Sequence, residues 1–201
     1  FRARPLALAA PGALHRGRRW VGLVLAAVVV QIALGGWVST NYAVLACQGF
    51  PTCNGQWWPR MDMAHGFTLL RHLGQTGGGE ALAFDALVAI HMAHRLFAIV
   101  VVLALGALLL ALRRSGDATA RRYALALGVL LAWQLASGLS NVVLGWPIVA
   151  ALAHSAGAAG LVGVLTSLWA RLPGAAQAGA AADRPRPSGA AGATARHTPA
   201  A

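Results

Sequence analysis

The sequence predicts an all-α membrane protein built as an antiparallel bundle of four transmembrane helices. Hydrophobic residues make up 58% of the 201 residues, only 10% are charged, and the mean hydropathy is positive. This composition is typical of a chain inside a bilayer and excludes an ordinary soluble domain. Four apolar segments, at about 20–45, 82–112, 123–145 and 147–170, are each long enough for a helix, which needs roughly 20 residues to cross the hydrocarbon core.

The arginines predict the orientation of these segments. All 16 basic residues are arginines, and they gather at the segment ends and in the tail. We therefore interpret the net charge of +11 as a sign of membrane topology, with no nucleic-acid partner expected. The clusters Arg16–Arg19, Arg113–Arg122 and Arg171 fall on one side, which the positive-inside rule assigns to the cytoplasm. We predict a multi-pass protein of the bacterial inner membrane with both termini cytoplasmic.

Three parts of the chain follow from this topology. Residues 1–19 form a basic cytoplasmic segment, residues 20–171 the transmembrane domain with an outer loop at 46–81, and residues 172–201 a tail predicted to be disordered. Because the chain opens on Phe1, we expect a fragment of a longer one. The string Gln31-Ile-Ala-Leu-Gly35 parallels Gln134-Leu-Ala-Ser-Gly138, which predicts two related helical hairpins.

Two histidines and an arginine interrupt the second apolar segment, in the stretch Ala89-Ile-His-Met-Ala-His-Arg95. Ionisable groups at membrane depth are costly unless a partner or ligand satisfies them, so they mark a functional site. Counted from the inner segment ends, His94 lies about 18 residues out and His154 about 16, so at about 1.5 Å per residue their depths differ by roughly 3 Å. We predict that His94 and His154 ligate a haem iron from its two faces.

Each of these residues also has a plainer explanation. The small residues around both histidines leave room for a macrocycle but also favour close helix packing without one. Arg95 fits a haem propionate, or extends outward or pairs with Asp85. His91 lies one turn beyond His94 and matches His154 poorly, so an ordinary hydrogen-bonded role competes with ligation. Polar residues of the first and third segments line a cofactor cleft or bond between helices: Gln31, Ser39, Thr40, Asn41, Gln134, Ser137, Ser140 and Asn141.

The outer loop holds the chain's two cysteines, Cys47 and Cys53. Their separation of six residues on the oxidising face fits a short-range disulfide. They match neither a haem-attachment motif nor a zinc pattern. A bridge that closes the loop and a redox-active pair are both compatible with the sequence, and Trp57 and Trp58 fit a membrane interface.

Three stretches resemble the carboxy-terminal half of proteobacterial haem A synthases. They are QIALGGWVSTNYAVLAC from Gln31 to Cys47, FPTCNGQWWP from Phe50 to Pro59, and AIHMAHR from Ala89 to Arg95, and the resemblance covers about residues 18–171. It implies that this chain is half of an eight-helix pseudo-symmetric membrane enzyme. That enzyme converts haem O to haem A for cytochrome oxidase by oxidising a ring methyl to a formyl group.

The resemblance also implies roles for single residues. His94 and His154 correspond to the histidine pair of the second and fourth helices, which holds a haem b that handles electrons, and Cys47 with Cys53 corresponds to a disulfide. The substrate haem O is expected in an amino-terminal half, whose Glu-x-x-His-Arg motif carries a glutamate implicated in catalysis. In this chain His91 stands at the matching position. The resemblance therefore favours the cofactor half and assigns no catalytic residue here.

Partners follow from the same resemblance, and two other function classes stay open. Expected partners are haem, membrane lipid, haem O synthase, cytochrome oxidase assembly proteins and further copies of the chain. One alternative is a bis-histidine b-type cytochrome that exchanges electrons with quinone without modifying haem. Another is a transporter or assembly factor whose buried histidines relay protons. A second set of helices with Glu-x-x-His-Arg would identify the synthase, and a purified chain without low-spin haem bands would exclude haem ligation.

Overall fold

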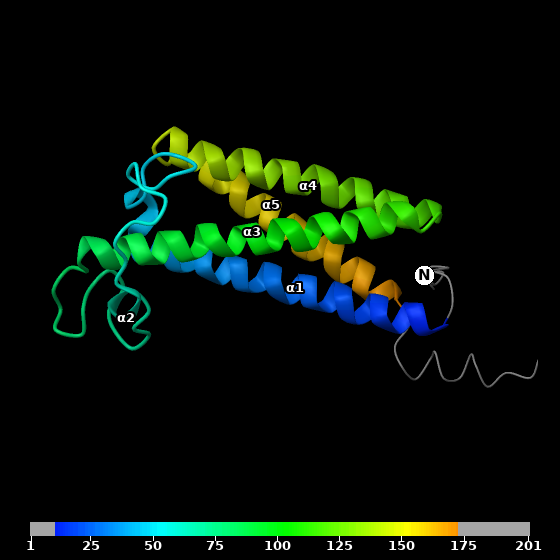
Figure 1. The fold of residues 1–201 in the computed structure, drawn as a ribbon, viewed down its shortest axis with the longest axis horizontal. Coiled ribbons are helices and arrows are strands. Elements are labelled where there is room, and N and C mark those ends of the chain that lie inside the picture. The colour runs from blue at the N-terminus through cyan, green and yellow to red at the C-terminus, as the bar shows by residue number, and fades with distance from the viewer. Residues whose placement is uncertain (1–10, 173–201) are drawn as a thin grey trace, which may run out of the picture.

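Four long helices lie side by side in the computed structural model, which describes residues 11–172 and the side chains of residues 17–172 (Figure 1). They are α1 (Pro11–Thr40), α3 (Phe84–Arg114), α4 (Ala118–Val143) and α5 (Ile148–Arg171). Each is long and apolar enough to cross a membrane. The predicted all-α, four-helix membrane bundle is confirmed. The predicted tail lies outside the described residues, apart from Leu172, and so do residues 1–10 of the basic segment.

Three helix ends differ by five residues or more from those expected from hydropathy. α1 begins at Pro11 rather than near residue 20, so Arg16, Arg18 and Arg19 belong to the helix. α1 ends at Thr40 rather than near residue 45. At this end, Nδ2 of Asn41 donates a hydrogen bond to the Trp37 carbonyl at 2.9 Å, and Oδ1 of Asn41 accepts one from the N–H of Gly74 at 3.2 Å. The next residue, Tyr42, is left-handed with φ 58°. A 3₁₀ turn, η1 (Ala43–Leu45), follows.

At the other end of the bundle, α4 begins earlier than expected. Asp117 caps the helix, since its Oδ1 accepts the N–H of Ala120 at 2.7 Å. Arg121 and Arg122 therefore lie in the first turns of α4 rather than in a loop. A polar capping residue, which hydropathy alone does not reveal, decides where the helix starts.

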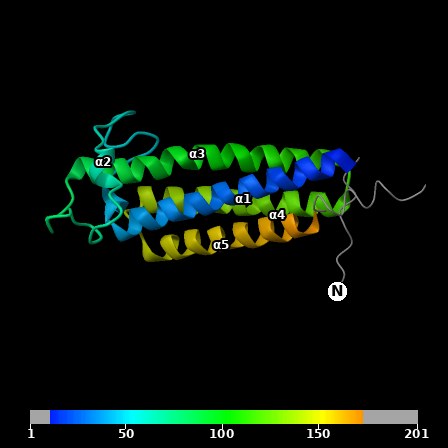
Figure 2. The ribbon, with the colours of Figure 1, turned by 90° about the horizontal axis from the view of Figure 1, so that it is seen from below.

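The four helices form a ring in which each packs against two neighbours. α1 packs against α3 and α5, and α4 packs against the same two helices. α3 and α5 thus occupy opposite corners of the bundle, an arrangement that can be followed in the turned view (Figure 2). The hairpin α1–α3 faces the hairpin α4–α5. This pairing places the segments that carry His94 and His154 across the bundle from each other.

An apolar core fills the half of the bundle next to the arginine-rich helix ends. It consists of buried residues from all four helices: Val21, Val24, Val28, Val101, Leu105, Leu108, Leu112, Ala120, Ala124, Leu127, Leu161, Leu165, Leu168 and Leu172. This core stops toward the other end at Val28, Val101, Leu127 and Leu161. The level of His94 and His154 lies beyond it.

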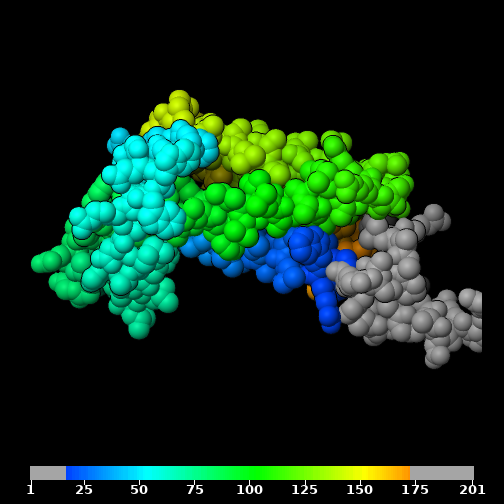
Figure 3. Space-filling model, in the orientation of Figure 1, coloured from blue at the N-terminus to red at the C-terminus, as the bar shows by residue number. Residues whose placement is uncertain are grey.

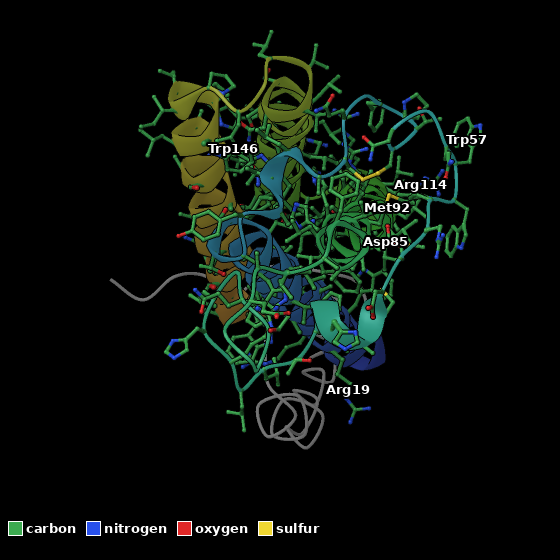
Figure 4. The ribbon with its side chains drawn as sticks, turned by 90° about the vertical axis from the view of Figure 1, so that its left-hand side faces the viewer. Arg19, Trp57, Asp85, Met92, Arg114 and Trp146 are labelled. Atoms are coloured by element: carbon green, nitrogen blue, oxygen red, sulfur yellow. A yellow bond between two sulfur atoms is a disulfide. The ribbon has the colours of Figure 1, made fainter. Side chains whose placement is uncertain are left out.

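The opposite end of the bundle is covered by the loop between α1 and α3, which contains the short helix α2 (Met63–Gly66). Space-filling spheres of this loop sit over the ends of the long helices (Figure 3). Cys47 and Cys53 form the predicted disulfide, and both pack with Met92 of α3. Figure 4 views this end and shows the bridge beside Met92, with Trp57 at the periphery and directed away from the helices.

The apolar core should carry much of the stability of the bundle. Leu165 of α5 is 0% exposed and Leu152 of the same helix is 66% exposed. Leu165→Ala should lower the free energy of unfolding by about 2–5 kcal/mol, because it leaves a cavity among packed side chains. Leu152→Ala is the matched control and should change it little. Denaturant titration of the purified chain in detergent measures both, and equal losses would contradict this account of the packing.

Candidate functional site

The site is built around His94 of α3 and His154 of α5. Their helices stand at opposite corners of the ring, and both side chains are only partly buried. The His94 ring packs against α1 and the His154 ring against α4. In the space-filling view, α5 is visible through a hollow between α3 and α4 beside the outer loop (Figure 3). The structure therefore places both predicted ligands in the half of the bundle beyond the apolar core.

Each imidazole lies against a glycine of the partner helix in its own hairpin. A Cβ added to Gly35 would lie 3.0 Å from Cε1 of His94, and one added to Gly138 would lie 3.1 Å from Cε1 of His154. The corresponding separations from Nδ1 and Nε2 are 3.5 Å and 3.9 Å in both pairs. The two rings thus pack on α1 and α4 in matching orientations. A side chain at either glycine would force the ring to move.

Polar groups from the same helices surround the rings. Gln31 Nε2 donates to the backbone carbonyl of His94 at 3.1 Å and lies 3.1 Å from its Nδ1. Ser137 Oγ lies 3.0 Å from Nδ1 of His154. The Oε1 atoms of Gln31 and Gln134 are buried without a hydrogen-bond partner. Two orphaned acceptors at equivalent positions leave the site polar and incompletely satisfied within the protein itself.

These contacts give the weak sequence repeat a structural meaning. Gly35 stands to His94 as Gly138 stands to His154, and a glutamine, Gln31 or Gln134, lies four residues before each glycine. Sequence reasoning treated the glutamines as general cleft or interhelical residues and did not assign the glycines. The shared Gln-x-x-x-Gly spacing was the signal that could have identified them.

Arg95 is held by the disulfide loop. Its guanidinium donates to the carbonyl of Cys47 at 2.8 Å, of Gly49 at 3.0 Å and of Thr52 at 3.2 Å. The Nε–H is buried and has no partner. Asp85, the alternative partner, has its carboxylate 3.7 Å from Nε of Arg60 instead. Arg95 therefore links the turn of α3 that carries His94 to the outer loop.

His91 occupies a different environment from its neighbour. It is buried, and its Nδ1 lies 2.9 Å from the carbonyl of Ala43. Because a carbonyl only accepts hydrogen bonds, Nδ1 carries the hydrogen. The structure gives His91 the ordinary hydrogen-bonded role that competed with ligation.

The remaining titratable residues of the outer loop form no comparable site. Asp62 accepts the backbone N–H of His65 at 3.1 Å and lies 2.6 Å from its Nδ1. These hydrogen bonds, of which the one from the backbone N–H has the larger effect, hold the pKa of the Asp62 carboxyl below its usual value. Within residues 11–172, no group of three or more His, Cys, Asp or Glu side chains is placed to hold a metal ion.

Comparison with known proteins shows the family to which this chain belongs. Residues 2–166 match the model of a family described as "Cytochrome oxidase assembly protein". This chain belongs to that family. No solved structure matches it.

Two curated relatives of this family member are haem A synthases. The chain is 35% identical to the one from Shewanella oneidensis over 169 residues, which cover 84% of this chain and 51% of that protein. It is 32% identical to the one from Chelativorans sp. strain BNC1 over 164 residues, which cover 81% of this chain and 42% of that protein. The chain thus spans about half the length of these relatives. The comparisons give no support to a free-standing electron-transfer cytochrome.

The contacts of Arg95 predict how firmly the disulfide loop is held. Cys47 and Cys53 are 2% and 1% exposed, so a reductant reaches them only when the loop opens. Arg95→Gln removes charge-assisted hydrogen bonds, each contributing about 1.5–3 kcal/mol, and should speed reduction by a phosphine at least about tenfold. Thiol labelling over time measures the rate.

Arg60→Gln is the matched control at the same end of the bundle. Arg60 makes only an exposed ion pair with Asp85, which contributes little to stability. Its reduction rate should stay near that of the unsubstituted chain. An unchanged rate in Arg95→Gln would show that the loop is held without the guanidinium.

Proposed function

We propose that this chain is the cofactor-haem half of a haem A synthase, an enzyme of haem A biosynthesis for cytochrome oxidase. Family membership and the two haem A synthase relatives support this activity. The observation that carries it is the pair of imidazoles, His94 and His154, which come from opposite corners of the bundle and each pack on a glycine of their own hairpin. The conversion is the oxidation of a ring methyl of haem O to a formyl group.

The residues present fit a haem. Two imidazoles would supply nitrogen ligands for the iron, and the large residues of the apolar core stop short of their level. His94 and His154 would hold the iron, which when bound supplies one-electron oxidation and reduction. Gly35 and Gly138 let the rings lie close to the helix backbones. The protein contributes ring orientation and a largely apolar surround, which tune the iron potential.

Arg95 is proposed as the contact of a haem propionate. Its terminal nitrogens bind the carbonyls of the disulfide loop, but its Nε–H has no partner. A buried N–H of a guanidinium needs an acceptor, and a carboxylate next to His94 would supply one. Arg95 would then join the disulfide loop, the helix of His94 and the cofactor.

The half proposed here handles electrons rather than the substrate. His91 stands where the substrate-binding half of haem A synthases has a glutamate, and its Nδ1–H is bonded to the Ala43 carbonyl. We assign the bound group as haem b and place haem O in a separate amino-terminal half. The disulfide Cys47–Cys53 is assigned a structural role, since its loop carbonyls anchor Arg95.

The chain is proposed to lie in the bacterial inner membrane. The arginines that end α3, begin α4 and end α5 share one end of the bundle, and the disulfide loop covers the other. This separation supports a cytoplasmic arginine-rich end and an oxidising outer face. Haem O synthase, assembly proteins of cytochrome oxidase and further copies of the chain are the proposed partners.

Histidine variants test haem ligation directly. The purified chain supplied with haem b should show a low-spin spectrum, and His94→Ala and His154→Ala should each abolish it because six-coordination needs both imidazoles. His91→Ala, one turn away on α3, and the exposed loop variant His72→Ala should keep it. Absorption spectra of oxidised and reduced samples give the result. Unchanged bands in both ligand variants would refute the proposed site.

The glycine contacts predict a second, graded effect. Gly35→Ala places a methyl 3.0 Å from the His94 ring, so the ring must shift, whereas a Cβ at the adjacent Gly36 meets nothing within 4 Å. Haem affinity should fall about tenfold or more in Gly35→Ala, the scale seen when the support of a metal ligand is disturbed. Gly36→Ala should bind like the unsubstituted chain. Haem titration followed by absorbance compares them, and equal affinities would contradict the packing of the ring on α1.

A further inference from the structure

The hydrogen-bond partners of the two imidazoles differ, although their glycine contacts match. His154 faces a hydroxyl, Ser137 Oγ, whereas His94 faces the amide of Gln31. In the repeat, the position equivalent to Ser137 is Leu34. The two candidate ligands are therefore oriented by different chemistry. A neutral imidazole carries hydrogen on only one ring nitrogen, so these partners decide which nitrogen is free to ligate a metal.

Ser137 has a single hydroxyl hydrogen, and backbone carbonyls compete for it. Its Oγ lies 2.7 Å from the carbonyl oxygen of Trp133 and 3.4 Å from that of Gln134. Because carbonyl oxygens cannot donate, the hydroxyl donates to Trp133. Toward His154 Nδ1, at 3.0 Å, Oγ then presents only lone pairs. The hydrogen between these two atoms must come from the ring.

We propose that Ser137 is a positioning residue for His154: it accepts the Nδ1–H and so leaves the Nε2 lone pair free to ligate iron. The chain of hydrogen bonds runs from His154 Nδ1–H to Ser137 Oγ and from Ser137 O–H to the Trp133 carbonyl. Ser137 is 8% exposed, so water has little access to replace it. The assignment of iron as the ligand rests on the proposed function, whereas the ring tautomer does not.

An acceptor on Nδ1–H also affects a bound metal. It increases the electron density that the imidazole donates from Nε2, and this favours the ferric over the ferrous state. The Gln31 amide lies near both ring nitrogens of His94, at 3.1 Å and 3.3 Å, and does not select one of them. Ser137 therefore gives the two axial ligands unequal strength.

A serine within a helix commonly bonds to the carbonyl one turn back and does nothing more. Ser140 of the same helix shows this behaviour, since its Oγ donates to the Ala136 carbonyl at 2.8 Å. Ser137 makes the same kind of bond, to the Trp133 carbonyl, and in addition contacts His154. Ser140→Ala is therefore a matched control: it removes a serine-to-carbonyl hydrogen bond of the same kind but no contact with the imidazole.

The first test uses the haem-free chain in bilayers with ¹⁵N-labelled histidine. Solid-state NMR distinguishes protonated from unprotonated ring nitrogens, and the His154 signals are assigned by their loss in His154→Gln. Protonated Nδ1 and unprotonated Nε2 in the unsubstituted chain are expected. Ser137→Ala should lose this preference, and Ser140→Ala should keep it. Hydrogen on Nε2 of His154 in the unsubstituted chain would overturn the proposal, even if the serine variant failed to fold.

The second test measures the reduction potential of the haem-loaded chain. Ser137→Ala should shift the ferric-to-ferrous equilibrium about tenfold toward the ferrous state, the lower end of the effects seen for such partners. For a one-electron couple, tenfold corresponds to about 59 mV. Ser137→Thr should restore the original potential because it keeps a hydroxyl.

The outcomes separate this proposal from the proposed function. A chain that binds no low-spin haem refutes the haem site and leaves the NMR result to decide the role of Ser137. A Ser137→Ala variant that keeps both the haem bands and the original potential refutes the influence of Ser137 on the iron. Loss of haem in both Ser137→Ala and Ser137→Thr would show that packing, not the hydroxyl, matters there.

Discussion

Two imidazoles carried by opposite corners of an otherwise apolar four-helix bundle, beyond its apolar core, are the constraint on which the site depends. Polar rings within the hydrocarbon span must find partners from the protein or a ligand. The Gln31 amide beside His94 and the Ser137 hydroxyl beside His154 meet this need. Most of the buried large aliphatic residues lie in the other half of the bundle, and smaller clusters that include Ile90 and Val88 lie near the outer loop. Packing thus supplies stability in one half, and polar contacts shape the other.

The bundle is built from two hairpins that share a local plan and then diverge. Each places a glycine of its first helix against the histidine of its second, with a glutamine four residues before that glycine. The divergence lies in Ser137 against Leu34, and in the connections, where a long disulfide loop joins α1 to α3 and a short turn joins α4 to α5. The similarity of the hairpins places the two candidate ligands, His94 and His154, at similar depth. The differences give their imidazoles different hydrogen-bond partners.

The outer loop is part of the site rather than a separate cover. Arg95 follows His94 directly and binds three carbonyls between Cys47 and Thr52. The disulfide fixes the ends of that turn, so it presents converging carbonyls to a cation. A movement of the loop would be transmitted to the helix turn that carries His94. Through Arg95, the disulfide loop is thus linked to the turn of α3 that carries His94.

The sequence by itself determined the four-helix membrane fold, because long apolar runs and arginine-rich ends fix spans whatever their packing. It also predicted that His94 and His154 lie at similar depth, since depth follows from counting residues along straight helices. Only the tertiary structure decided that α3 and α5 stand at opposite corners, that Arg95 binds the disulfide loop and that Gly35, Gly138 and Ser137 touch the rings. Rotation of each helix about its axis and the partners of its polar groups depend on contacts between segments distant in sequence, which periodicity and depth do not contain.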